Sequence, residues 1–120
     1  MKIIVAGGRD FNSYEMLEKE LTSIIDINKD ENIEIVSGCA RGADTLGIKF
    51  AKENNIPIKF FPALWDQYGK SAGMIRNKQM AEYGDFLLAF WDGKSHGTKN
   101  MIKTMKEMNK HGKVVIYEIN

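Results

Sequence analysis

The chain has 120 residues, 43% of them hydrophobic, which predicts one globular domain over residues 1–120 with a single core. Its 17 basic and 16 acidic side chains give a formal net charge of +1, which excludes a general electrostatic attraction to nucleic acid and leaves only a local basic patch. The single cysteine, Cys39, excludes an internal disulfide, and no apolar run approaches the roughly 20 residues of a membrane span. We expect a cytoplasmic protein with no membrane segment, metal site or cofactor.

Five runs rich in β-branched and aromatic residues predict strands at residues 2–6, 33–36, 58–61, 86–91 and 114–119. Helical periodicity lies between these runs. The first helix is expected to begin at an N-cap, Asn12, with Glu15 three residues on. Its apolar face comprises Leu17, Leu21, Ile24 and Ile25.

Three further helices are predicted after the second, third and fourth strands. Leu46, Phe50 and Ala51 share one face of the second helix, and the third covers about residues 71–82. The fourth is expected to end near Gly112, with His111 as a partner of the helix dipole. Its apolar stripe is interpreted as core or as a dimer seam, and comprises Met101, Ile102, Met105 and Met108.

Strands that alternate with helices predict an α/β fold with a mostly parallel five-stranded sheet and helices on both faces. The loops that follow strands, at residues 7–10, 37–44, 63–70 and 92–98, are rich in glycine and charge. The loops that lead into strands are short and plain. Because ligands of open α/β sheets bind beyond the carboxyl ends of the strands, the site is expected at that edge.

The loop at residues 37–44 carries the strongest single signal. A β-branched run breaks there into glycines and Arg41 before a helix begins. Glycine allows close approach of the backbone to a ligand, and the first turn of a helix offers unpaired N–H groups to an anion. Arg41 would add charge and a planar donor fork, so the loop predicts a phosphate site.

Other familiar motifs do not fit. Residues 69–71 imitate the end of a Walker A loop, but Leu64 stands where its first glycine belongs. A dinucleotide fingerprint fails because no third glycine follows residues 7–8. Cys39 is interpreted as a small packing residue rather than as a nucleophile activated by His96.

Four blocks of the chain together closely resemble the YspA-like branch of the SLOG superfamily, which is named after the Smf/DprA and LOG proteins. They are GGRDF at residues 7–11, SGCARGAD at 37–44, AGMIRN at 72–77 and WDGKSHGT at 91–98. The resemblance implies a three-layer Rossmann-like fold with a nucleotide-type pocket. The ligand-binding residues that it implies are Gly7, Gly8, Arg9, Ser37, Gly38, Arg41, Gly42, Ala43, Asp44, Arg76, Asn77, Asp92, Gly93, Ser95, Gly97 and Thr98.

The resemblance also implies roles for several of these residues. Gly38 and Gly42 would clear space for a phosphate or ribose, and Arg41 would either contact phosphate or fold back on Asp44 as a strut. Arg76 corresponds to the arginine that LOG-type enzymes use near the glycosidic bond, so it is expected to project inward with Asn77 rather than to form a solvated helix face.

The loop at residues 93–98 is predicted to be a second phosphate loop. Its backbone N–H groups and the hydroxyls of Ser95 and Thr98 would receive the phosphate, and Thr98 is also the expected N-cap. Three aromatic residues near strand ends, Trp65, Tyr68 and Trp91, are candidates either for stacking on a base or for core and subunit contacts.

One departure from the LOG pattern concerns catalysis. LOG-type phosphoribohydrolases carry a glutamate three residues beyond the Gly-Thr pair, where this chain has Met101. A thioether neither takes a proton nor stabilises an oxocarbenium-like centre, so turnover would need Asp92 or Asp44, with Arg76 as a third catalytic candidate.

The sequence therefore favours a homo-oligomeric protein that binds a nucleotide or nucleotide-derived ligand, as a sensor, carrier or sequestering protein. The ligand classes expected are ADP-ribose-type molecules, cyclic nucleotides and nucleoside monophosphates. One alternative is a nucleotide N-glycosidase. The other is single-stranded nucleic-acid binding, as in DprA relatives, which the near-neutral charge disfavours.

Overall fold

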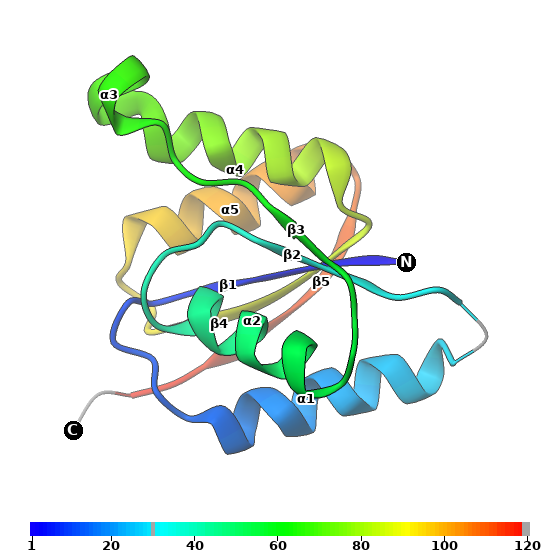
Figure 1. Ribbon diagram of the computed structural model, residues 1–120. Coiled ribbons are helices and arrows are strands. Elements are labelled where there is room, and N and C mark those ends of the chain that lie inside the picture. Colours follow the sequence, from blue (N-terminus) through cyan, green and yellow to red (C-terminus); the bar gives the residue numbers. More distant parts are fainter. Residues whose placement is uncertain (30, 119–120) are drawn as a thin grey trace.

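The computed structural model describes residues 1–29 and 31–118 (Figure 1). The elements in chain order are β1 (Lys2–Gly7), α1 (Tyr14–Ile27), β2 (Glu34–Ser37), α2 (Ala43–Glu53), β3 (Ile58–Phe60), α3 (Trp65–Tyr68), the 3-10 turn η1 (Gly69–Ser71), α4 (Ala72–Tyr83), β4 (Phe86–Trp91), α5 (His96–Glu107) and β5 (His111–Ile116).

All five strands pair in parallel, in the order β3-β2-β1-β4-β5. Val5 of β1 lies opposite Ser37 of β2 on one side and Leu88 of β4 on the other. The chain builds the sheet outward from β1 through β2 to β3, then returns to the other side of β1 with β4. This confirms the predicted α/β class and identifies a single-domain Rossmann-like fold.

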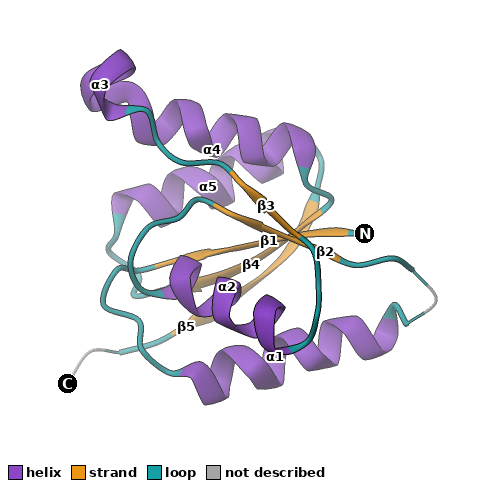
Figure 2. Ribbon diagram, in the orientation of Figure 1, coloured by secondary structure: helices purple, strands orange, loops and turns teal. Residues whose placement is uncertain are grey.

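Helices cover both faces of the sheet, with α1 and α2 on one face and α4 and α5 on the other (Figure 2). Successive residues of β1 point to opposite faces. Ile3 and Val5 pack in the core cluster under α1 and α2, whereas Ile4 and Ala6 pack under α4 and α5. A strand buried on both sides needs a continuous apolar run, which β1 and β4 have.

The N-cap of α1 is Ser13 rather than the predicted Asn12. The Ser13 hydroxyl accepts a hydrogen bond from the Met16 backbone N–H at 3.3 Å. Asparagine and serine cap helices about equally well, so the sequence alone did not separate the two neighbours. The predicted apolar face is confirmed, because Leu17, Leu21 and Ile24 are buried and Ile25 packs against them.

The end of α5 differs from the prediction. The helix ends at Glu107, and Asn109 rather than Gly112 adopts the left-handed conformation beyond it, with φ 57°. Strand β5 already begins at His111, which pairs with Phe86, so His111 does not lie at a helix end as predicted. Backbone pairing with β4 overrides the loop-like character of residues 111–112. Ile119, the last residue of the predicted strand, lies outside the described residues.

The third helix, predicted over residues 71–82, is α4 at Ala72–Tyr83. The segment before it, predicted as a loop, contains α3 and η1. Figure 1 places α3 at the end of the molecule where the strands have their carboxyl ends. Trp65 and Tyr68 therefore belong to a short helix and do not directly follow a strand.

Candidate functional site

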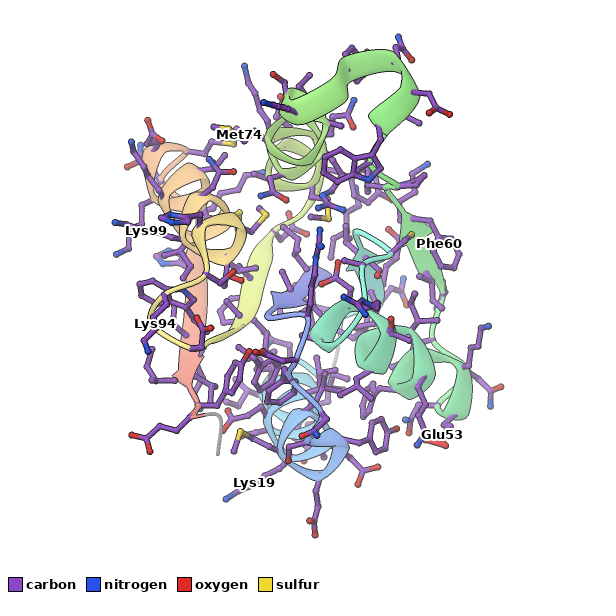
Figure 3. The ribbon with its side chains drawn as sticks, turned by 90° about the vertical axis from the view of Figure 1, so that its left-hand side faces the viewer. Lys19, Glu53, Phe60, Met74, Lys94 and Lys99 are labelled. Carbon is purple, nitrogen blue, oxygen red and sulfur yellow. The ribbon has the colours of Figure 1, made fainter. Side chains whose placement is uncertain are left out.

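A cavity of about 640 Å³ lies where the chain changes direction in the sheet, beyond the carboxyl ends of β1 and β4. Figure 3 views the molecule from this end. A topological switch point leaves a crevice, because the connections from the two neighbouring strands run to opposite sides. The cavity is lined by Ala6, Gly7, Gly8, Arg9, Asp10, Ala40, Arg41, Asp44, Arg76, Asn77, Asp92, Ser95, Gly97, Thr98 and Met101.

Most of the predicted site residues lie in this lining, drawn from four separate segments. The loop near position 40 and the loop near position 95 both border the cavity. The predicted residues outside the lining are Ser37, Gly38, Gly42, Ala43 and Gly93, and the lining residues not predicted are Ala6, Asp10, Ala40 and Met101. Asp10 lies within the GGRDF block, so its position could have indicated it; the alanines carry no chemical signal.

Gly42 shapes the loop at residues 37–44. It has φ 81°, and a Cβ placed there would lie 2.1 Å from the Gly8 carbonyl oxygen. The next residue, Ala43, donates its backbone N–H to the same oxygen at 3.3 Å. Only a glycine permits this close approach in the left-handed conformation. Gly42 therefore holds the loops at residues 7–10 and 37–44 together and does not border the cavity.

Ser37 supports the same loop from within the core. Its side chain is fully buried, and its hydroxyl donates to the Asp44 carbonyl oxygen at 3.3 Å while accepting the Cys39 backbone N–H at 3.2 Å. Ser37 thus fixes the turn, and its hydroxyl is engaged by the protein.

Arg76 reaches from α4 to the loop at residues 37–44. Its Nη1 donates to the Gly38 carbonyl oxygen at 2.6 Å and its Nε donates to the Asn77 Oδ1 at 3.0 Å. A Cβ on Gly38 would lie 2.5 Å from Arg76 Nη1 and 2.9 Å from Asp44 Oδ2, so a larger residue at this position would displace the ends of these two side chains. Arg76 projects inward, as the family resemblance implies.

Asp44 is buried at the first turn of α2 and accepts the Ala40 backbone N–H at 3.3 Å. Burial raises the pKa of its carboxyl group to about 6, against the opposing effects of the Arg76 charge and of backbone donors. Among the described residues no ion pair joins Arg41 to Asp44, and Arg41 is exposed. The strut interpretation of Arg41 is therefore wrong, and the cation near Asp44 is Arg76.

Asn77, with Arg76, connects the loop at residues 37–44 to the start of α5. Its Nδ2 donates to the Gly97 carbonyl oxygen at 3.2 Å and to the Asn100 Oδ1 at 3.0 Å, while its Oδ1 accepts from Arg76. Adjacent residues of α4 thus hold the first loop through Arg76 and the start of α5 through Asn77. The distance between the two walls of the cavity depends on this pair.

Asp92 organises the second loop. Its Oδ1 accepts the backbone N–H groups of Lys94 at 2.8 Å and Ser95 at 2.7 Å, and these two donors hold the pKa of the Asp92 carboxyl below its ordinary value. The N-cap of α5 is Ser95, so the prediction of Thr98 as N-cap is wrong. No side chain caps this helix, so the N–H groups of its first turn have no side-chain acceptor, and Gly97 and Thr98 of that turn border the cavity.

The lining holds equal numbers of positive and negative side chains, but they differ in whether a protein group already binds them. The positive residues are Arg9, Arg41 and Arg76, and the negative ones are Asp10, Asp44 and Asp92. Each carboxylate already accepts a hydrogen bond from the protein, and Asp10 takes one from the Tyr117 hydroxyl at 2.6 Å. In the described part of the chain, neither Arg9 nor Arg41 has a carboxylate within ion-pair distance. Exposed Lys94 and Lys99 lie beside the start of α5 (Figure 3).

Cys39 differs from the prediction. It is exposed, with φ 66°, and is not a packing residue. Desolvation and the nearby Asp44 charge raise the pKa of its thiol. A raised pKa reduces the thiolate fraction at neutral pH, so Cys39 lacks the character of an activated nucleophile.

The aromatic and methionine candidates fall into different environments. Trp91 donates its indole N–H to the Ser95 carbonyl oxygen at 3.0 Å and thereby holds the second loop. Trp65 and Tyr68 are 51% and 39% exposed. Met101 and Met105 are buried, which confirms the core interpretation of this stripe, and Met101 also borders the cavity.

The parallel sheet and the cavity at its switch point define a Rossmann-like α/β protein. The model of the YspA, cpYpsA-related SLOG family matches residues 1–68. The chain is also 32% identical, over 127 residues, to the Gene 61 protein of Mycobacterium phage D29, with 96% of this chain and 94% of that protein covered. The chain belongs to the YspA, cpYpsA-related SLOG family.

Membership of the SLOG family suggests nucleotide-related binding or processing. Within residues 1–29 and 31–118, none of the helices has the length and apolar character needed to cross a bilayer.

Proposed function

We propose that this protein binds a nucleotide or a nucleotide-derived ligand, with a phosphate of the ligand at the start of α5. One observation carries the proposal: the carboxylates of the cavity are engaged by protein donors, whereas Arg9, Arg41 and the first N–H groups of α5 are available. Available cations beside a helix N-terminus attract an anion. The cavity volume of about 640 Å³ lies within the range of roughly 300–1,000 Å³ typical of small-molecule sites.

Binding without turnover is favoured by two residues of the cavity, Asp92 and Met101. Asp92 has a lowered pKa and is therefore ionised at neutral pH, so it has no proton to donate to a leaving group. Met101 offers no carboxylate. The ligand classes proposed are nucleoside monophosphates, cyclic nucleotides and ADP-ribose-type molecules.

Calorimetric titration with one member of each class tests the proposal. At least one ligand is expected to bind with one site per chain, and Arg41→Gln is expected to weaken binding roughly tenfold or more through loss of a charge-assisted contact. Lys19→Gln, which removes one exposed positive charge from α1 at a distance from the cavity (Figure 3), is the matched control and should bind like the wild type. Absence of binding by a folded sample to every class contradicts the proposal.

A second candidate, nucleotide N-glycosidase activity, is favoured by Asp44. A carboxyl group with a pKa of about 6 at a cavity wall has the character of a general acid. Chromatographic detection of free base, released from a nucleoside monophosphate by the wild type but not by Asp44→Asn, would favour the enzyme. If the protein binds the monophosphate but releases no free base from it, the result favours binding as the function.

A further inference from the structure

A second, smaller hollow of about 310 Å³ adjoins the main cavity. The two share Arg9, Ala40, Arg41 and Arg76, so one ligand can reach both. The smaller hollow is different in character, because its lining also includes Pro62, Ala63 and Trp65. Apolar side chains and guanidinium groups around one hollow suit a flat, uncharged ring attached to an anion.

Trp65 is part of this lining. It lies on α3, at the carboxyl end of the sheet (Figure 1), and its side chain is 51% exposed. A Cβ on Gly73 would lie 3.6 Å from the indole Cη2, so the tip of the ring points toward a residue of α4 that has no side chain. About half of the surface of the Trp65 side chain is therefore open to a ligand.

The neighbouring apolar side chains do not share this position. Phe60, Leu64 and Tyr68 are exposed to similar extents. Among the described residues that line the smaller hollow, Trp65 is the only aromatic. A general apolar surface for a protein partner would not single out one ring beside the arginines.

We propose that the smaller hollow is the base subsite, in which the aromatic base of the nucleotide stacks on the indole of Trp65. This rests on the proposed function: the phosphate lies in the main cavity, and Arg9 and Arg41 lie along the boundary that the two hollows share. Stacking on tryptophan is tolerant of base identity because every base has a π-face. The ligand class is then a nucleoside phosphate, and a sugar phosphate without a base uses only half of the site.

The experiment compares calorimetric affinities for adenosine monophosphate, uridine monophosphate and ribose 5-phosphate in four proteins. They are the wild type, Trp65→Ala, Trp65→Phe and, as the matched control, Tyr68→Ala, which removes an exposed aromatic residue of the same helix that does not line the hollow. Trp65→Ala is expected to bind the nucleotides roughly 5- to 150-fold more weakly, as for loss of base–aromatic stacking. Trp65→Phe should recover most of this loss, and the affinity for ribose 5-phosphate should not change.

Three results with Trp65→Ala would overturn the base subsite. One is an equal affinity of Trp65→Ala and the wild type for the nucleotides. Another is a loss of affinity for ribose 5-phosphate as large as the loss for the nucleotides, which would show that Trp65 supports the whole site. The third is a change of sedimentation on Trp65→Ala, which would make the ring a subunit contact. Wild-type protein that binds ribose 5-phosphate as tightly as nucleotides refutes the subsite and leaves the proposed function standing, whereas binding of none of the probes refutes both.

Discussion

Two glycines with nearly the same φ angle have different roles. Gly42 has φ 81° and Gly93 has φ 83°. A Cβ on Gly42 would meet the Gly8 carbonyl oxygen and the Arg9 backbone, whereas a Cβ on Gly93 would meet nothing within 4 Å. The pair separates the penalty of a left-handed conformation from the penalty of a backbone clash.

Gly93→Ala is expected to lower the free energy of unfolding by about 1 kcal/mol, the penalty of placing a Cβ in the left-handed region. Gly42→Ala should lower it by about 2 kcal/mol more, because the loops at residues 8 and 42 must also move apart. Urea unfolding followed by circular dichroism measures both. Equal losses in the two variants would contradict the close approach of these loops.

The buried carboxyl group of Asp44 predicts a pH dependence of stability. Its pKa is raised from 3.8 to about 6 in the folded protein, so between these values the folded chain holds a proton that the unfolded chain has lost. The contribution of this group to stability is therefore greatest below about pH 4 and falls as the pH rises to about 6, by roughly 3 kcal/mol. The difference in unfolding free energy between the wild type and Asp44→Asn, measured from pH 4 to pH 7, should follow this fall. A difference that stays constant over this range would show that Asp44 does not titrate there.

At the scale of elements, the two helix N-termini that approach the cavity differ. Helix α2 carries Asp44 in its first turn, and its Ala43 N–H donates to the Gly8 carbonyl oxygen. Neither helix has a side-chain cap, but α5 has no acidic residue in its first turn. The loop at residues 37–44 gave the stronger sequence signal, yet the helix that follows it carries a buried carboxyl group and an engaged first N–H, whereas the helix after residues 92–98 starts without an acidic residue. Sequence spacing does not reveal which N–H groups the fold itself satisfies.

Gly97 tests the role of this uncapped end. Its position within α5 is helical, and a Cβ there would meet nothing within 4 Å. Gly97→Ala is therefore expected to stabilise the fold by about 0.5–1 kcal/mol, while narrowing the cavity and weakening nucleotide binding. Thermal unfolding and calorimetry on the same sample measure the two effects. Tighter or unchanged binding in this variant would contradict a ligand at the start of α5.

The link that α4 makes between the two loops gives another prediction. Asn77→Ala leaves Arg76 Nε, the Gly97 carbonyl oxygen and the Asn100 side chain without this partner, and should cost about 1–3 kcal/mol of stability. The neighbouring Lys78 is exposed, so Lys78→Ala is the matched control and should change stability by less than about 0.5 kcal/mol. Chemical denaturation measures the free energy of unfolding of the two variants. Comparable values would show that Asn77 does not support the site.

At the scale of the whole molecule, local patterns were sufficient for the class of fold. The apolar runs of β1 and β4 and the periodicity of α1 predict a parallel sheet between helices, and the structure has it. Features that depend on long-range contacts were not predictable in this way. Pairing with β4 extends β5 back to His111. A contact across 38 residues of sequence brings Arg76 to Gly38, and Arg76 rather than nearby Arg41 is the cation beside Asp44.

For the site too, local sequence patterns predicted the region, whereas the roles of single residues depend on long-range contacts. The strand order places the carboxyl ends of β1, β2 and β4 side by side, so loops chosen for glycine and charge border a common cavity. The contribution of each residue depends on packing: Gly42 and Ser37 support the walls, whereas Gly97 and Arg41 border the space. Residue type indicated the region, and only the three-dimensional contacts separate support from lining.

We propose that a phosphate-bearing ligand lies between the loops near positions 40 and 95, at the start of α5. A proton–nitrogen correlation NMR titration of the isotope-labelled protein with a nucleoside monophosphate tests this placement. The backbone N–H signals of Gly97, Thr98, Gly8 and Arg41 are expected to shift together and saturate with one affinity, while signals on the outer surface of α1 stay unchanged. Shifts confined to α1, or no saturable shift at Gly97 and Thr98, would contradict it.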